Sequence, residues 1–135
     1  MTALENKQLL QNIFAELAQG NPRPFIDSMA DDFRWSIPGN TKWSRTYDGK
    51  QVVLDQLLAP LHSMIVDRVR TNAHRFIAEG DFVVVEARGN NVTKAGKPYN
   101  NTYCFVVRLD GAKLREITEY MDTELVTDVL EDPAA

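Results

Sequence analysis

Apolar residues recur along this chain with two different periods, which divide it into a helical first half and a strand-rich second half. Near the start they follow the i, i+3, i+4, i+7 spacing of an amphipathic helix: Leu10, Ile13, Phe14 and Leu17. This spacing predicts a helix over 4–18, which Gly20 and Pro22 end. The chain should therefore begin with a helix that buries one apolar face.

A short helix and a short strand are predicted next. The helix covers 24–30 and has Pro24 in its first turn, where proline is well tolerated. Residues 31–39 then alternate between polar and apolar, as in a strand that ends at a Pro-Gly pair. Its apolar side carries three residues: Phe33, Trp35 and Ile37.

A polar loop and a third helix close the first half. The loop over 40–47 is irregular apart from two large aromatic residues, Trp43 and Tyr47, and it is a candidate lid. The helix over 48–61 opens with an aspartate cap at its first residue. Pro60 should kink or split it near its end, because proline has no amide hydrogen and its ring clashes with the preceding turn.

After residue 64 the period changes to two, which is the period of β-strands. Four strands joined by glycine-containing turns are predicted, over 66–78, 82–92, 99–109 and 113–121. Helices followed by such a meander indicate one α+β domain spanning 1–135. We expect a cone-shaped, curved antiparallel (mixed) sheet with three N-terminal helices packed on its concave face and a pocket at the mouth of the cone.

The last predicted strand carries one acid among apolar neighbours. Alternation along 113–122 places four residues on one face: Arg115, Ile117, Glu119 and Met121. Because Ile117 and Met121 should point inward, we expect them to take Glu119 with them, and burial would raise the pKa of its carboxyl towards neutrality. The alternatives are that Glu119 pairs with Arg88 or Arg115, or that it stays in water at a sheet edge.

Composition and charge exclude several functional classes. The net charge of −4 and the absence of a basic stripe argue against nucleic acid and against acidic membranes as partners. No run of apolar residues is long enough to span a membrane, and the first residues lack the pattern of a signal peptide. A lone cysteine, Cys104, excludes an internal disulfide and fits a reducing compartment, so we expect a cytoplasmic location.

Sequence motifs for bound groups are also missing. The two histidines and the cysteine have no zinc-site spacing, and neither a phosphate-binding loop nor a GxSxG elbow occurs. We therefore expect no metal and no cofactor.

A series of short motifs resembles one family along nearly the whole chain. It comprises Gly20-Asn21, Met29 to Trp35, Tyr47 to Lys50, Ala78 to Asp81, Gly96 to Tyr103 and Ile117 to Asp122. Together these resemble the SnoaL-like branch of the nuclear transport factor 2-like superfamily, whose cone fold is shared with ketosteroid isomerases and limonene-1,2-epoxide hydrolases. The superfamily includes enzymes, binders and adaptors, so the resemblance indicates the fold more specifically than the activity.

The resemblance implies that only part of the known catalytic apparatus is present. The tyrosine of the isomerases corresponds to Ile13 and their base to Ile37, and no acid lies near their oxyanion position. An arginine and an aspartate of the epoxide hydrolases correspond to Ala87 and Gly89. Their second aspartate corresponds to Glu119, which is the one acid–base residue that the resemblance retains.

Histidines matter because the SnoaL-type polyketide cyclases use a single acid with a histidine nearby. His74 lies on a predicted strand with the parity of Phe76, and the sequence leaves open whether that side faces inward. The other histidine, His62, is expected at the surface of a helix.

Nine residues are candidates for lining the pocket beside Glu119: Trp35, Ile37, Trp43, Tyr47, Ala87, Gly89, Tyr103, Ile117 and Met121. Each has a structural alternative. Trp35 is equally suited to the core, and Trp43 and Tyr47 to a dimer contact instead of a lid. Tyr103 shares a strand face with Asn101, and both can donate to a carbonyl, although Asn101 can also cap a turn.

Two functions fit these residues. The first is a cofactor-free isomerase, cyclase or epoxide hydrolase that uses Glu119 as a proton shuttle on a lipophilic carbonyl or epoxide compound. The second is a domain of the same fold that binds a hydrophobic small molecule, or mediates dimerisation, without catalysis. A third option, an adaptor with no pocket, predicts that Trp35 and Met121 touch across the cone.

The opposite side of the last strands suggests a partner. We expect Thr102, Thr118, Tyr120 and Asp122 on the outer face of the sheet, where they would be partly covered in a two-fold homodimer.

Overall fold

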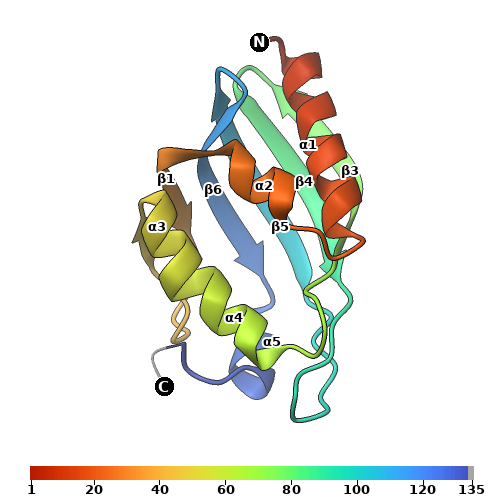
Figure 1. Cartoon of the computed structure of the whole chain (residues 1–135), viewed down its shortest axis with the longest axis vertical. Helices are drawn as coiled ribbons and strands as arrows, with labels where there is room; N and C mark the ends of the chain where they lie inside the picture. Colours follow the sequence, from red (N-terminus) through yellow and green to blue (C-terminus); the bar gives the residue numbers. More distant parts are fainter. Residues whose placement is uncertain (134–135) are drawn as a thin grey trace.

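The computed structural model describes residues 1–133 and has the predicted α+β architecture, a curved six-stranded sheet with helices on its concave side (Figure 1). The strand order is β2-β1-β6-β5-β4-β3. The strands are β1 (Met29–Ser36), β2 (Thr46–Asp48), β3 (Thr71–Glu79), β4 (Phe82–Gly89), β5 (Thr102–Asp110) and β6 (Lys113–Met121). All neighbours are antiparallel except β1 and β6, which run parallel, so the sheet is mixed as predicted.

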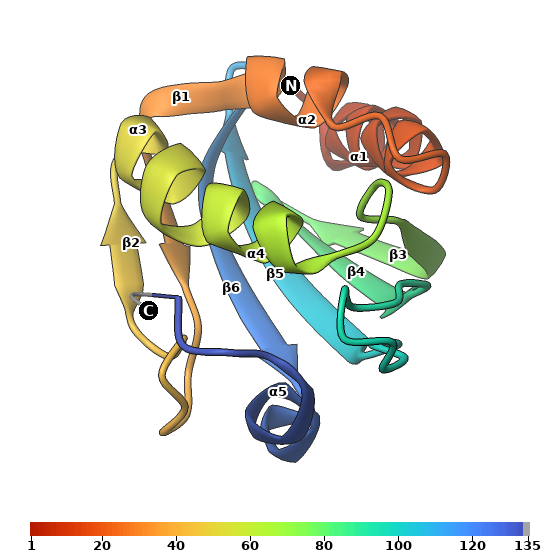
Figure 2. The same ribbon diagram turned by 60° about the horizontal axis from the view of Figure 1, so that its bottom comes forward.

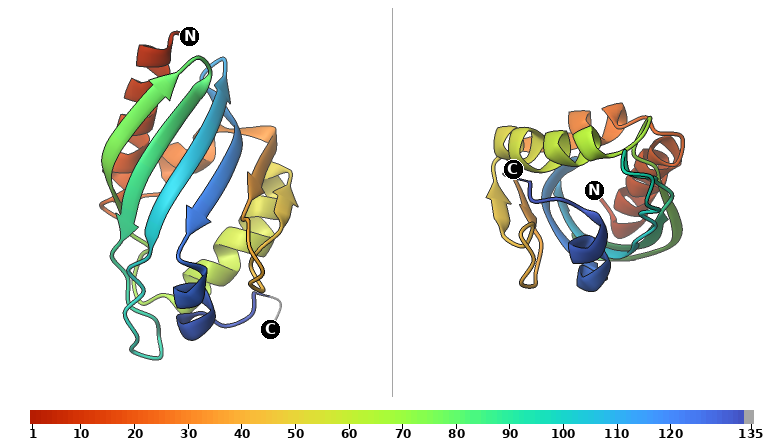
Figure 3. Two further views of the ribbon diagram at one scale, coloured as in Figure 1. Left: turned by 180° about the vertical axis from the view of Figure 1, so that it is seen from behind. Right: turned by 90° about the horizontal axis from the view of Figure 1, so that it is seen from below.

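Helices close the concave side of the sheet. They are α1 (Ala3–Leu17), α2 (Arg23–Ser28), α3 (Lys50–Val52), the π-helical segment η1 (Val53–Leu58), α4 (Ala59–Met64) and α5 (Thr123–Val129). The segments α3, η1 and α4 follow one another without a break and cross the concave side, while α5 lies at the end of β6 (Figure 2). The view from below in Figure 3 shows the sheet curling around the interior with these helices opposite it.

Local sequence explains where the first helix begins. Thr2 accepts a hydrogen bond from the Glu5 amide, and the Glu5 side chain accepts one from the Thr2 amide, which together form a capping box. The buried residues of α1 include Leu10, Ile13 and Phe14, as the helical spacing predicted.

The third helix differs from its prediction. Asp48 belongs to β2 and does not cap the helix; Gly49 holds the N-cap position, with no side-chain hydrogen bond. The expected disturbance near Pro60 takes the form of the π-helical segment that precedes α4. A wider π turn is a known response where the regular hydrogen-bond ladder cannot continue, as it cannot at a proline.

The segment before β3 was predicted wrongly. Residues 66–70 form a loop, and β3 begins at Thr71. Arg70 is held there because its amide donates to the Asn91 side chain at 2.8 Å. Directly before this loop, Ile65 forms an isolated β-bridge with Thr93.

The register between strands shifts at three places: between Met29 and Arg34 of β1, on β6 and on β3. On β6, Arg108 pairs with Glu116 and Leu109 pairs with Leu114, so Arg115 is an extra residue. The predicted alternation therefore fails before residue 116, where Leu114 is buried and Arg115 points outward. On β3 a similar shift leaves His74 unpaired and exposed.

None of the helices in residues 1–133 is long and apolar enough to cross a membrane.

Candidate functional site

A cavity of about 290 Å³ lies between the concave face of the sheet and the helices. Its walls are mostly apolar and come from elements far apart in the sequence. They include Phe14 and Leu17 of α1, Phe25 of α2, Leu57 and Leu58 of η1, Leu61 of α4, Phe105 of β5, and Val126 and Leu130 near the C-terminus. A cavity of this size and lining suits a small lipophilic molecule.

Glu119 is the buried acid of this cavity. It lies on β6 two residues after Ile117, whose side chain also lines the cavity, and its exposed fraction is 8%. The Trp35 indole Nε1 donates to Glu119 Oε1 at 2.9 Å. Burial raises the pKa of the Glu119 carboxyl to about 7, and the hydrogen bond from Trp35 opposes this shift only in part.

Trp35 is held in place by the sheet and by rings around it. It sits opposite Ile117 in the parallel pairing of β1 with β6, which brings its indole next to Glu119. Phe25, Phe33 and Phe105 meet its ring edge to face, with centroids 5.8, 6.1 and 6.3 Å away. The orientation of the hydrogen bond is therefore set by packing.

Two tyrosine hydroxyls share the cavity with the acid. Tyr103 on β5 stacks on Phe105, and Tyr99 precedes β5; both line the cavity. The two hydroxyls interact, which lowers the pKa of Tyr99 and raises that of Tyr103. Burial is the largest cause of raised pKa for both, and the charge of Glu119 adds to it, so both remain neutral hydrogen-bond donors at neutral pH.

Asn101 anchors this tyrosine pair. Its Nδ2 donates to the Tyr99 hydroxyl at 3.2 Å and to the Asp122 carbonyl at 3.1 Å. Its Oδ1 accepts from the amides of Thr102 and Asp122, at 2.8 and 3.0 Å. Because the Tyr99 hydroxyl accepts from Asn101, its own hydrogen is available to a bound molecule.

The aromatic loop is fixed and not an open flap. Trp43 lines the cavity, and its Nε1 donates to the Glu131 carbonyl at 2.9 Å, which ties the C-terminal segment over the cavity. The Tyr47 hydroxyl donates to the Trp43 carbonyl at 2.9 Å, and Arg45 lies over the Tyr47 ring. Tyr47 therefore supports the loop from below and does not line the cavity.

The cavity brings together Glu119 and six of the nine candidate residues: Trp35, Ile37, Trp43, Tyr103, Ile117 and Met121. Ala87 and Gly89 lie beneath the lining. Ala87 pairs with Tyr103 across β4 and β5. A Cβ added at Gly89 would lie 3.5 Å from Tyr103 Cε2, so the small residues make room for the tyrosine ring.

Sequence reasoning missed five polar residues of the lining: Tyr99, His62, Asp67, Arg68 and Thr71. Tyr99 has the same parity as Asn101 and Tyr103, which was the signal that could have found it. His62, Asp67 and Arg68 mark the mouth, since they are the lining residues that are exposed. No periodicity could have placed Asp67 and Arg68, because they lie in the loop that was taken for a strand.

Neither histidine approaches the acid directly. His74 is exposed on the bulge of β3 and does not line the cavity, which answers the question that the sequence left open. His62 is exposed, as expected, and sits at the cavity mouth; partial burial lowers the pKa of its imidazole, so it is neutral at pH 7.

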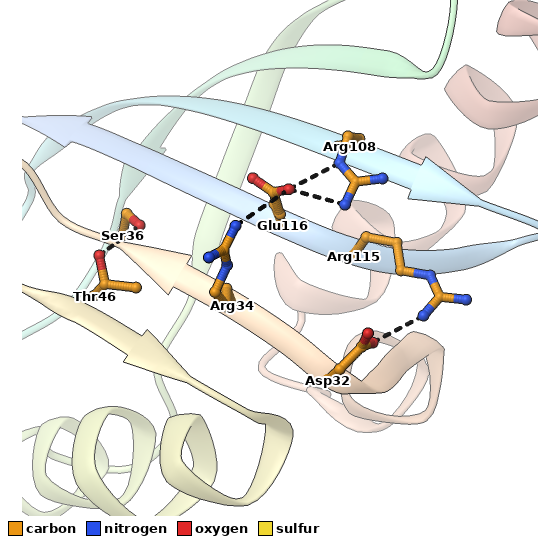
Figure 4. A network of polar contacts seen from close by, with 7 residues as sticks. All are labelled: Asp32, Arg34, Ser36, Thr46, Arg108, Arg115 and Glu116. Carbon is orange, nitrogen blue, oxygen red and sulfur yellow. Dashed lines mark hydrogen bonds and ion pairs between the residues drawn. The ribbon is translucent and has the colours of Figure 1, made fainter.

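Neither arginine proposed as a partner pairs with Glu119: Arg88 is exposed on β4, and Arg115 is engaged elsewhere. Arg115 pairs with Asp32 at 2.8 Å on the outer face of the sheet, next to Glu116, which binds Arg108 and Arg34 at 2.8 and 3.6 Å (Figure 4). With Asp110, which lies 3.8 Å from Arg115, this outer network has three acids and three arginines on the β1–β6–β5 surface. Within residues 1–133 no group of three or more histidine, cysteine, aspartate or glutamate side chains is placed to hold a metal ion.

Comparisons with known proteins agree with this architecture. Residues 10–117 match the model of the SnoaL-like domain. A solved NTF2-like protein of Burkholderia xenovorans LB400 is 24% identical over 97% of this chain and 99% of its own, with a TM-score of 0.73. One of Burkholderia thailandensis E264 is 18% identical, covering 97% and 99%, with a TM-score of 0.80.

A third solved structure, TerC co-crystallised with polyporic acid, is 17% identical to this chain and covers 92% of it and 96% of TerC, with a TM-score of 0.75. No curated protein matches the chain. At these identities the solved structures establish the fold alone.

Proposed function

Because the chain belongs to the SnoaL-like domain family, we propose that it binds a small lipophilic carbonyl compound in its cavity and that Glu119 moves a proton on that compound. One observation carries this proposal. Glu119 is a buried carboxyl with a pKa of about 7 inside an apolar cavity. A group that is half ionised at neutral pH can act both as a base and as an acid.

The geometry suggests how the proton would move. The substrate carbonyl oxygen accepts a hydrogen bond from the Tyr99 hydroxyl, and the ionised Glu119 takes a proton from the adjacent carbon. The negative charge that develops on the oxygen is stabilised by Tyr99, whose hydroxyl is polarised by the hydrogen bond from Asn101. In a β,γ-unsaturated compound the proton returns to the γ-carbon of the dienolate, which shifts the double bond and gives an isomer.

The same enolate allows ring closure. Its carbon attacks a second carbonyl of the same molecule, a carbon–carbon bond forms, and the new alkoxide takes the proton from Glu119. Both versions balance with no co-reactant. A dry cavity favours them, since enolates in water are quenched before they react further.

Non-catalytic binding is the second candidate. The observation that favours it is Ile37, an apolar cavity residue where the resemblance to the isomerases placed their base. In that case Glu119 is a protonated donor to the ligand, held by Trp35. The observed fold of TerC with bound polyporic acid supports small-molecule binding as one use of this architecture. Cys104 is a free thiol, which is consistent with a cytoplasmic location as part of this proposal.

Deuterium exchange separates the two candidates. Decan-2-one is incubated with the protein in D₂O, and loss of the hydrogens next to its carbonyl is followed by NMR. The expected rate rises with pH around a midpoint near 7, and Glu119→Gln lowers it by about 10²–10⁴-fold.

Glu116→Gln is the matched control, because it removes a β6 acid from the outer face and should leave the rate unchanged. Binding of decan-2-one without exchange establishes the non-catalytic candidate. Full exchange by Glu119→Gln rules out the proposed role of this residue.

A further inference from the structure

The mouth of the cavity carries a cation that no acid neutralises. Arg68 lines the cavity and is exposed. Among the seven ion pairs recorded within residues 1–133, none includes Arg68. Its guanidinium makes one hydrogen bond, from Nη1 to the Gly20 carbonyl at 3.2 Å. The remaining N–H groups of the Arg68 guanidinium are available to a ligand.

Packing fixes the position of this arginine. Gly20 ends α1 with a φ of +80°, and a Cβ at this position would lie 2.8 Å from Arg68 Cβ and 3.0 Å from its Cδ. The arginine stem therefore lies directly against the backbone of the turn between α1 and α2. Only glycine permits both the left-handed backbone and this close approach. The charge is thus held at the mouth instead of extending freely into solvent.

Other ionisable groups at the mouth leave this charge uncompensated. Asp67, the one acid there, pairs with Arg70 at 3.0 Å. His62 is neutral at pH 7, because partial burial lowers its pKa. Counted together with Arg70, which neutralises Asp67, these groups carry a net charge of one positive unit, which Arg68 supplies.

The acid lies at a separate, inner end of the cavity. The Glu119 side chain is buried, with 8% exposed, whereas Arg68 is exposed to solvent, so the two groups lie at different depths of the cavity. Apolar walls that include Phe14, Leu17 and Leu61 complete the lining. The site has two polar ends of different chemistry joined by an apolar passage.

We propose that the natural ligand is an amphipathic anion, whose carboxylate or equivalent acidic group binds Arg68 at the mouth while its carbonyl end reaches Glu119 and Tyr99. This inference rests on the proposed function and adds the substrate class. The cavity of about 290 Å³ has the volume of roughly ten liquid water molecules at about 30 Å³ each, which fits a ligand of about ten to fifteen non-hydrogen atoms.

Three probes of equal length test the charged end. They are 9-oxodecanoate, its methyl ester and decan-2-one, which carry the same methyl ketone with an anionic, a neutral and no second polar group. Dissociation constants are measured by isothermal titration calorimetry at pH 8 in low salt. We expect 9-oxodecanoate to bind about five- to thirty-fold tighter than its ester, as for a charge-assisted contact at a partly buried arginine.

Variants assign the preference to Arg68. Arg68→Gln should bind acid and ester equally, whereas Arg68→Lys should keep part of the preference because the charge remains. Arg88→Gln is the matched control, since it removes an exposed arginine of β4 that does not line the cavity. The preference should also weaken with added salt, because the mouth is open to solvent.

The outcomes distinguish this inference from the proposed function. Equal binding of acid and ester to the unaltered protein, or an acid preference that survives in Arg68→Gln, overturns the anionic ligand and leaves the proposed function standing. Failure of all three probes to bind overturns both. Melting temperatures of the variants show whether each is folded. If Arg68→Gln does not fold, the preference for acid over ester is measured on Arg68→Lys instead.

Discussion

At the scale of single residues, the chemistry depends on one carboxyl and one indole. The sequence predicted that Ile117 and Met121 would bring Glu119 inside, and they do. It could not predict Trp35 as the partner, because the two residues are 84 positions apart and meet only through the parallel pairing of β1 with β6. That pairing depends on the whole chain having folded.

Removal of the indole donor should change the acidity of the site. Trp35→Phe eliminates a hydrogen bond to the charged form of Glu119, and that bond lowers the pKa. The pKa should therefore rise further above its present value, and the pH dependence of exchange should move in the alkaline direction. Stability should fall by about 1–2 kcal/mol from the smaller ring and the lost bond.

Trp43→Phe is the control for this variant. Its indole donates to a backbone carbonyl of the C-terminal segment and not to Glu119. An equal alkaline shift in both variants would mean that loosened packing, and not the hydrogen bond, sets the acidity.

Glu119 should make its own contribution to the pH dependence of the free energy of unfolding. Below pH 4.5 both folded and unfolded chains hold the proton, and between pH 4.5 and 7 only the folded chain does. Raising the pH through this range therefore removes stability, by up to about 3 kcal/mol for a shift of this size.

Urea denaturation of the protein and of Glu119→Gln across pH 4.5 to 8 checks this. Subtracting the free energy of unfolding of Glu119→Gln from that of the unaltered protein cancels the contributions of the other acids. This difference should fall with rising pH until about pH 7 and then level off. A constant difference would contradict a raised pKa.

At the scale of elements, helical spacing and turn residues were sufficient for most of the fold. Strand parity placed Ile117 and Glu119 inside, but it failed where a bulge adds a residue, at His74 and at Arg115. Such shifts depend on the neighbouring strand and leave no periodic signal in the sequence. The strand β2 was missed for a similar reason, since its three residues are ordered by pairing with β1.

The short helix α5 offers a test at this scale, because it carries part of the cavity wall. Asp122 caps it, accepting from the amides of Glu124 and Leu125 at 3.1 and 3.3 Å, and was not predicted in this role. Asp122→Ala should cost about 0.5–2 kcal/mol and weaken binding of decan-2-one. Asp128→Ala, an exposed position of the same helix, is the control.

Hydrogen exchange locates the effect of the Asp122 substitution. Faster exchange of α5 amides with an unchanged sheet is expected from loss of a cap. Unchanged exchange in α5 would show that the cap does not hold this part of the wall.

At the scale of the whole molecule, the outer face of the sheet is the surface without a helical layer (Figure 3). A row of side chains crosses it in register, formed by Ile77, Val84, Val106 and Thr118. Large apolar side chains of this face are exposed to solvent: 55% of Ile77, 46% of Phe82 and 51% of Tyr120 is accessible. Such a face favours self-association.

We predict a homodimer through this face. Val106→Lys places a charge in the middle of the row and should convert the dimer to a monomer in sedimentation velocity runs. Val92→Lys, at an exposed apolar residue away from the face, should leave the dimer intact. A monomeric unaltered protein at high micromolar concentration would contradict the prediction.

The site as a whole was predictable only in part. Its inner wall follows from strand parity, and its acid from the residues on either side. The mouth of the cavity could not be predicted in this way. His62, Asp67 and Arg68 come together there through the end of a helix and an irregular loop, whose path depends on tertiary contacts. The polar end that would select a ligand is thus the part that sequence periodicity describes least.

The central claim is that Glu119 is a carboxyl with a pKa near neutrality, and its titration tests this most directly. In protein labelled with ¹³C at glutamate side-chain carboxyls, the Glu119 resonance is assigned by its absence in Glu119→Gln and followed from pH 4 to 9. The midpoint of the Glu119 titration should lie at about 7. A midpoint between 4 and 5, where ordinary glutamates titrate, would contradict it.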